Sequence, residues 1–135
     1  MGEERQADIS LELHITPSVV RAYAEVAGDF NPIHFDDAAA RAVGLPRRSA
    51  HGMISGALLS RLLTRVHGDA WLRSGVLSIK FVRPVLVGER VVARAMPAEP
   101  ESATLVVRVD NEEGLPVIVG HARLAQPIED RTASM

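Results

Sequence analysis

The hydrophobic period of this chain changes from helical to alternating at Gly75, and that change limits the folds open to it. From His51 to about Val66 apolar residues recur nearly all round, which predicts a helix buried over most of its surface. After Gly75 apolar and polar residues alternate, which predicts strands with one buried face. The four expected strands run over Val76 to Val85, Arg90 to Met96, Ala103 to Val109 and Pro116 to Ala125.

The N-terminal part adds one strand and shorter helices. Leu11 to Ile15 alternates as a strand, and Thr16 followed by Pro17 marks the start of a helix. Gly28 ends that helix, and a short helical run follows over Ala38 to Val43. The elements therefore occur in the order strand, helices, strands.

This order predicts one α+β domain over residues 1–135, with a long helix laid on a five-stranded antiparallel sheet. We expect the last four strands to form a meander, and residues 1–8 and 129–135 to be short flexible tails. So small a core leaves edge strands unpaired, and association through an edge predicts a dimer.

Composition excludes several classes of protein. The longest stretch without Asp, Glu, Lys or Arg is Ser49 to Ser60, 12 residues against the roughly 20 that a membrane-spanning helix needs. The absence of cysteine excludes disulfides, thiolate metal sites and cysteine nucleophiles. We therefore expect a cytoplasmic protein with no membrane partner.

The net charge of −2 is unevenly distributed: −6 over residues 1–37, +5 over 38–75 and −1 over 76–135. The basic segment favours an anionic partner or ligand, with solvated helix faces as the alternative. Aromatic residues do not interleave its arginines, so we expect no nucleic-acid partner. The six arginines are Arg41, Arg47, Arg48, Arg61, Arg65 and Arg73.

One short segment holds the residues with catalytic potential. Asp29 and His34 stand five residues apart in a proline-stiffened loop, and His51-Gly52 opens the buried helix. An imidazole moves protons near neutral pH, a carboxylate can orient it, and helix N-terminal N–H groups stabilise negative charge on a carbonyl oxygen. These residues predict proton transfer next to a carbonyl. Asp29 as a turn residue and His34 as a structural histidine are the alternatives.

Three segments carry a resemblance to a known family. Residues 23–34, with the sequence YAEVAGDFNPIH, Ala50-His51-Gly52-Met53 and residues 81–89, FVRPVLVGE, resemble the MaoC-like (R)-specific enoyl-CoA hydratases and acyl-carrier-protein dehydratases. The resemblance covers roughly residues 10–126. It implies a hotdog fold, in which an antiparallel sheet wraps a long central helix, assembled as a dimer.

The resemblance also implies roles for site residues. Asp29 and His34 would activate the water that adds to C3 of a trans-2-enoyl thioester and return a proton at C2, giving an (R)-3-hydroxyacyl thioester. Which of the two is the base stays open, with His34 favoured. Gly52 would offer its N–H to the thioester oxygen, where charge develops.

Further residues would support these. Asn31 would brace the loop, and His51 is interpreted as structural support for the site. Ser60 matches a supporting serine of the family, with a small packing residue as the alternative. Arg83 would face phosphates of the acyl carrier or an acidic neighbour.

The resemblance thus implies a hydro-lyase with no cofactor beyond the CoA or acyl-carrier-protein group of its thioester substrate. A hotdog thioesterase and a non-catalytic acyl-thioester-binding subunit are the alternatives. The expected assembly is a homodimer, with pairing to a second hotdog chain left open.

Overall fold

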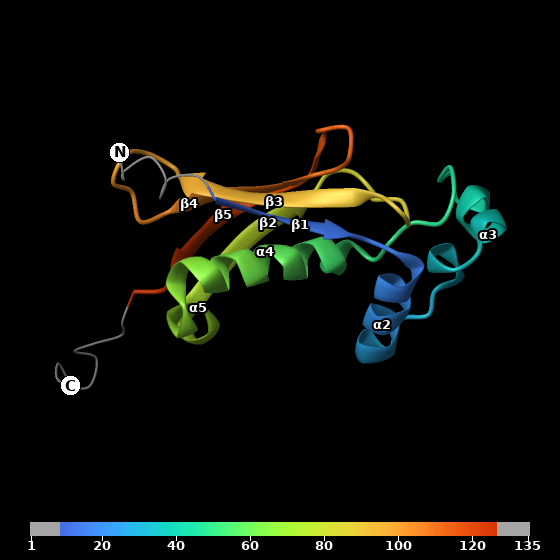
Figure 1. Cartoon of the computed structure of the whole chain (residues 1–135), viewed down its shortest axis with the longest axis horizontal. Helices are drawn as coiled ribbons and strands as arrows, with labels where there is room; N and C mark the ends of the chain where they lie inside the picture. The colour runs from blue at the N-terminus through green and yellow to red at the C-terminus, as the bar shows by residue number, and fades with distance from the viewer. Residues whose placement is uncertain (1–8, 127–135) are drawn as a thin grey trace.

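The computed structural model describes residues 9–126, which build one five-stranded antiparallel sheet with helices on one of its faces (Figure 1). The order of strands across the sheet is β1-β3-β4-β5-β2. This is the α+β hotdog architecture that the sequence predicts. The strands are β1 Ile9–His14, β2 Gly75–Phe81, β3 Arg90–Pro97, β4 Leu105–Asp110 and β5 Pro116–Leu124.

The long helix α4 (Gly52–His67) lies along the sheet, as the apolar run predicts (Figure 1). The smaller helices gather at its two ends. Three of them lie at the N-terminal end of α4 (Figure 1): α2 Pro17–Ala27, the 3-10 helix η1 Pro32–His34 and α3 Asp37–Ala42. The helix α5 (Asp69–Ser74) packs beside its last turn.

The core lies between α4 and the inner face of the sheet. Burial of one large aliphatic side chain contributes about 1.5–3 kcal/mol, so this layer supplies most of the hydrophobic stabilisation. The buried aliphatic side chains of α4 are Ile54, Leu58, Leu59, Leu62 and Leu63. They face the buried strand residues Val91, Ala93, Ala95, Val107, Val109, Ile118 and Ala122.

Helix α2 has the caps that the sequence predicts. The Thr16 side chain accepts the N–H of Val19 at 3.2 Å, and Pro17 occupies the first helical position. Gly28 ends the helix with φ +72°, a left-handed conformation that favours glycine, and its N–H donates to the Ala24 carbonyl oxygen at 2.7 Å. The chain therefore enters the loop of Asp29 in a fixed direction.

The expected meander is wrong for one strand. β3, β4 and β5 follow each other across the sheet, but β2 pairs with β5 at the far edge. β2 also ends at Phe81 and not at Val85, because the Val85 carbonyl oxygen accepts the N–H of Ala50 at 2.8 Å and Leu86 bridges to Ser49. Residues 82–89 therefore form a crossover between the two halves of the sheet.

The sequence does not predict α5. This helix has six residues, too few to show a period, and its stability comes from tertiary contacts. The buried Trp71 anchors it, donating from Nε1 to the Ser60 Oγ at 3.0 Å.

Two further expectations concern the ends of the chain and membranes. The tails expected at residues 1–8 and 129–135 lie outside the described residues. Over residues 9–126, none of the helices combines the length and the apolar character needed to cross a membrane.

The contact between β5 and β2 gives a test of the strand order. A Cβ on Gly120 would overlap the carbonyl oxygen of Ser78 and lie 2.8 Å from the Ile79 Cα, both of them main-chain atoms of β2. We expect Gly120→Ala to lower the free energy of unfolding by more than about 2 kcal/mol, measured by urea denaturation. His121→Ala, at the exposed next position, should change it by less than about 0.5 kcal/mol. Equal unfolding free energies for the two variants would contradict this pairing.

Candidate active site

The loop between α2 and α3 is shaped by its own side chains. The Asp29 Oδ1 accepts the N–H of Asn31 at 3.2 Å, and the Asn31 Oδ1 accepts the N–H of Ile33 at 3.1 Å, which caps η1. These two turns direct the chain so that His34 points inward while Asp29 stays at the surface. Asn31 thus has the loop-bracing position that the sequence predicts.

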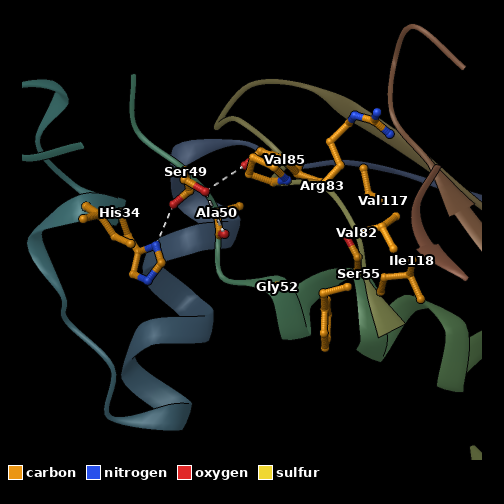
Figure 2. A pocket seen from close by; sticks show the side chains of 13 residues that line it. His34, Ser49, Ala50, Gly52, Ser55, Val82, Arg83, Val85, Val117 and Ile118 are labelled. Carbon is orange, nitrogen blue, oxygen red and sulfur yellow. Dashed lines mark hydrogen bonds between the residues drawn. The ribbon is translucent and has the colours of Figure 1, made fainter. Parts of the chain in front are cut away.

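His34 is buried, with 7% of its surface exposed, and its ring is held by one short hydrogen bond. Its Nδ1 lies 2.5 Å from the carbonyl oxygen of Ser49, drawn as a dashed line in Figure 2. A carbonyl oxygen accepts and cannot donate, so Nδ1 carries the hydrogen. In the neutral ring the Nε2 lone pair is then free to accept a proton.

That free nitrogen faces a carboxylate. His34 Nε2 and the Asp29 Oδ2 are 3.9 Å apart, with 8% of the His34 side chain and 49% of the Asp29 side chain exposed. This separation is too long for a direct hydrogen bond. The pair that the sequence singles out is therefore brought together with a gap between its reactive atoms.

His51 packs against this pair. Its ring stacks on that of His34, with centroids 3.6 Å apart and planes inclined by 25°. Its Nε2 lies 2.9 Å from the main-chain carbonyl oxygen of Asp29. His51, which the sequence analysis interprets as structural support, thus contacts both Asp29 and His34.

The Ser49 carbonyl that accepts from His34 belongs to a segment whose main chain is hydrogen-bonded to two other parts of the protein. The N–H of Ser49 donates to the Ile33 carbonyl oxygen at 3.0 Å, and the N–H of Ala50 donates to the Val85 carbonyl oxygen at 2.8 Å. The loop between α2 and α3, which carries His34, and the crossover 82–89 are therefore connected through residues 49 and 50.

Asp37 fixes Arg48, the residue that precedes Ser49. Its Oδ1 accepts the main-chain N–H of Arg48 at 3.0 Å and lies 3.2 Å from the Arg48 Nε. These contacts, the main-chain hydrogen bond first, hold the pKa of the Asp37 carboxyl below its ordinary value of 3.8. The carboxylate form thus anchors the segment that carries the Ser49 carbonyl.

A cavity of about 450 Å³ opens beside His34. Gly52, at the first turn of α4, lies on its wall together with residues of the crossover (Figure 2). N–H groups in a first helical turn have no partner within the helix, so Gly52 is a candidate hydrogen-bond donor at this wall. The cavity is otherwise largely apolar, with Ile33, Ala50, Phe81, Val82, Pro84, Val85, Val117 and Ile118 on its walls.

Two residues of this wall are not singled out by the sequence. Ser55, one turn after Gly52, is buried and lines the cavity. The Phe81 ring packs on Gly52, 3.1 Å from where a Cβ would stand. Residue type does not distinguish this serine and this phenylalanine from residues packed in the core, and the wall forms only where the crossover passes the start of α4.

Ser60 is not brought to this cavity. It lies two turns further along α4, and its Oγ accepts the hydrogen bond from Trp71 Nε1. This contact agrees with the packing interpretation, and a catalytic role for Ser60 stays a prediction.

The basic segment does not form one patch beside the site. Arg61 and Arg65 are exposed on α4, and Arg65 is about 20 Å along the helix from Gly52. Arg47 donates to the Val87 carbonyl oxygen, and Arg48 is used by Asp37. Arginines 47 and 48 therefore hold loops together.

Arg83 has a different position. It lines the cavity, and its guanidinium nitrogen Nη1 donates to the Pro116 carbonyl oxygen at 2.7 Å. The side chain is exposed, and its remaining N–H groups are available to an anion at the cavity mouth. Neither the phosphate partner nor the acidic neighbour expected for it is tested by this contact.

Asp29, His34 and His51 each offer a ligand atom, all within 4.8 Å of one another. Metal ions bind where ligand lone pairs converge on one point. Here two nearly parallel rings place their nitrogens side by side, and one nitrogen of each ring is directed at a main-chain carbonyl. The arrangement suits proton transfer better than metal coordination.

Comparison with known proteins gives a family match over most of the chain. Residues 2–113 match the family described as MaoC like domain. The chain is 34% identical to an (R)-specific enoyl-CoA hydratase of Aeromonas caviae over 113 residues, which cover 80% of this chain and 84% of that protein. It is also 41% identical over 75 residues to 3-hydroxyacyl-thioester dehydratase X of Mycobacterium tuberculosis, covering 56% of this chain and 25% of that longer protein.

A solved structure shares the whole architecture. The R-hydratase PhaJ1 from Pseudomonas aeruginosa, in its unliganded form, superimposes with a TM-score of 0.74 at 29% sequence identity. The match covers 90% of this chain and 81% of that one.

The cap of η1 can be tested separately from any activity. Asn31→Ala removes the acceptor of the Ile33 N–H, and we expect the free energy of unfolding to fall by about 1 kcal/mol in urea denaturation. Asn31→Ser, which keeps a capping oxygen, should recover most of that loss. If Ala and Ser lower the stability equally, the side chain of Asn31 does not cap this turn.

Proposed function

This chain belongs to the family described as MaoC like domain, and from that premise we propose that it is a lyase hydrating trans-2-enoyl thioesters reversibly to (R)-3-hydroxyacyl thioesters. The names of its relatives, an (R)-specific enoyl-CoA hydratase and a 3-hydroxyacyl-thioester dehydratase, support this reaction. The substrate is the thioester of CoA or of an acyl carrier protein.

The observation that carries the proposal is the gap of 3.9 Å between His34 Nε2 and the Asp29 Oδ2. One water oxygen about 2.8 Å from both atoms fits that gap, with an angle of about 90° between the two hydrogen bonds. Both atoms are acceptors when the ring is neutral and the carboxyl ionised, so such a water donates one hydrogen to each. Its lone pairs are then free to attack C3.

The tautomer of His34 supports its role as the base. The hydrogen bond from Nδ1 to the Ser49 carbonyl leaves Nε2 as the nitrogen that accepts the water proton. As the hydroxyl bonds to C3, the electron pair of the C2–C3 double bond moves toward the thioester carbonyl. A proton then returns to C2 from the Asp29–His34 pair, so that one water is added and neither side chain is consumed.

Negative charge develops on the thioester oxygen during this addition. The N–H of Gly52 at the start of α4 is the donor that we propose to stabilise it. Gly52 and His34 line the same cavity, which supports a thioester lying between them. The exposed Arg83 guanidinium at the same cavity would favour an anionic acyl carrier.

We propose that the protein acts as a homodimer that extends the sheet. β2 is an edge strand. Three exposed apolar side chains on it or next to it form a strip: Met53 is exposed by 48%, Phe81 by 49% and Val82 by 43%. An edge strand can pair with its own copy across a two-fold axis, which would cover this strip in both protomers. A cytoplasmic location stays a prediction.

Activity gives the direct test. Purified protein mixed with crotonyl-CoA should remove the enoyl-thioester absorbance, and Asp29→Asn and His34→Ala should each lower kcat/KM by about 100-fold or more, since each removes a group that moves a proton. Asp69→Asn and His121→Gln, exposed and outside the site, should retain the activity of the unchanged protein.

Three other outcomes separate the alternatives. Release of free thiol from saturated acyl-CoA, with the enoyl group untouched, would replace the lyase by a thioesterase. Binding of acyl-CoA without either reaction would favour a binding subunit. Full activity in His34→Ala would show that His34 is not the base.

The assembly is tested by light scattering. We expect a mass about twice the 14.6 kDa of the chain, reduced by Met53→Glu and unchanged by Leu72→Glu, which adds the same charge at an exposed site on α5. A monomer at micromolar concentration would contradict the homodimer and favour pairing with a second chain.

A further inference from the structure

We propose that His51 is a positioning residue for the Asp29–His34 pair, holding the main chain of Asp29 through Nε2–H and the ring of His34 by stacking. The inference rests on the proposed hydration, because that reaction requires the two reactive atoms to keep a separation that fits one water. It assigns His51 a specific task beyond general support of the site.

Asp29 is held in its loop by three hydrogen bonds. Its N–H donates to the Ala24 carbonyl oxygen at 3.1 Å and its Oδ1 accepts from Asn31, contacts made within α2 and the loop itself. Its carbonyl oxygen accepts from His51 Nε2 at 2.9 Å. This third bond ties the exposed loop to the residue at the N-cap position of α4, and therefore to Gly52, the proposed oxyanion donor that follows it.

His51 also packs on the ring of His34. The His51 ring covers it at a centroid distance of 3.6 Å, and Tyr23 of α2 packs against His51 at 4.9 Å. His51 is buried, with 5% of its surface exposed. A ring fixed between α2 and η1 prevents the His34 imidazole from tilting, so the His34 Nε2 keeps facing Asp29.

The chemistry of the contact explains why this position holds a histidine. Since a carbonyl oxygen only accepts, His51 Nε2 carries the hydrogen, and in the neutral ring Nδ1 is a bare acceptor. Over residues 9–126 that buried Nδ1 has no hydrogen-bond partner, a loss of stability that an apolar side chain would avoid. Packing alone therefore does not account for the imidazole, whereas donation from Nε2 does.

Two amides distinguish the nitrogens of His51. The side-chain nitrogen of Gln reaches the place of the imidazole Nε2, and that of Asn reaches only the place of Nδ1. We expect His51→Gln to keep kcat for crotonyl-CoA hydration within about threefold, and His51→Asn and His51→Leu to lower it about 100-fold. KM should stay within about twofold, because His51 does not line the cavity.

Equal kcat values for the Gln and Asn variants, or a loss confined to KM, would overturn the inference. A ring-nitrogen NMR measurement decides it independently of turnover. Long-range ¹H–¹⁵N spectra of the unchanged protein should place the hydrogen on Nε2 of His51 and on Nδ1 of His34, and His51→Gln should preserve the latter. A hydrogen on Nδ1 of His51 would overturn the inference, whereas absence of hydration in the unchanged protein would overturn the proposed function alone.

Discussion

The buried hydrogen bond from His34 Nδ1 to the Ser49 carbonyl oxygen joins two segments that are separated in the sequence. Ser49 belongs to the segment that bonds to the crossover 82–89, and that crossover exists because β2 and β3 stand in opposite halves of the sheet. The order of the strands therefore determines where the carbonyl lies. The carbonyl in turn fixes the tautomer of the imidazole, and a buried hydrogen bond of this kind is strengthened by its apolar surroundings.

The two members of the pair occupy unlike environments. His34 is buried and lines the cavity, whereas the Asp29 side chain is half exposed and is not part of the cavity wall. The imidazole thus stands between a carboxylate that water can reach and a space that an acyl thioester can occupy. His34 Nε2 can therefore contact a water molecule beside Asp29 while a thioester occupies the cavity, as the proposed addition of water requires.

Features formed by neighbouring residues were predictable from the sequence. Thr16, Gly28 and Asn31 each form a hydrogen bond within a few residues, so their caps and turns were predictable from residue type. The central helix was predictable because its apolar run is long. The motif of Asp29 and His34 was found because both residues lie in one short loop, although their gap of 3.9 Å depends on tertiary contacts.

The features that residue type does not reveal depend on contacts between distant segments, and among them only the place and the end of β2 were predicted wrongly. The place of β2 beside β5 depends on a crossover whose bonds to residues 49 and 50 no periodicity reveals. The contact of Ser60 with Trp71 depends on α5, which is too short to predict, and the contact of His51 with the Asp29 carbonyl joins residues 22 apart.

A crystal structure of the protein with an (R)-3-hydroxyacyl thioester tests the central claim most directly. The account predicts that the C3 hydroxyl oxygen occupies the gap, about 2.6–3.2 Å from both the Asp29 Oδ2 and the His34 Nε2, with the thioester oxygen at the Gly52 N–H. A C3 hydroxyl outside hydrogen-bond distance of His34, or a thioester carbonyl seated between Asp29 and His34, would contradict it.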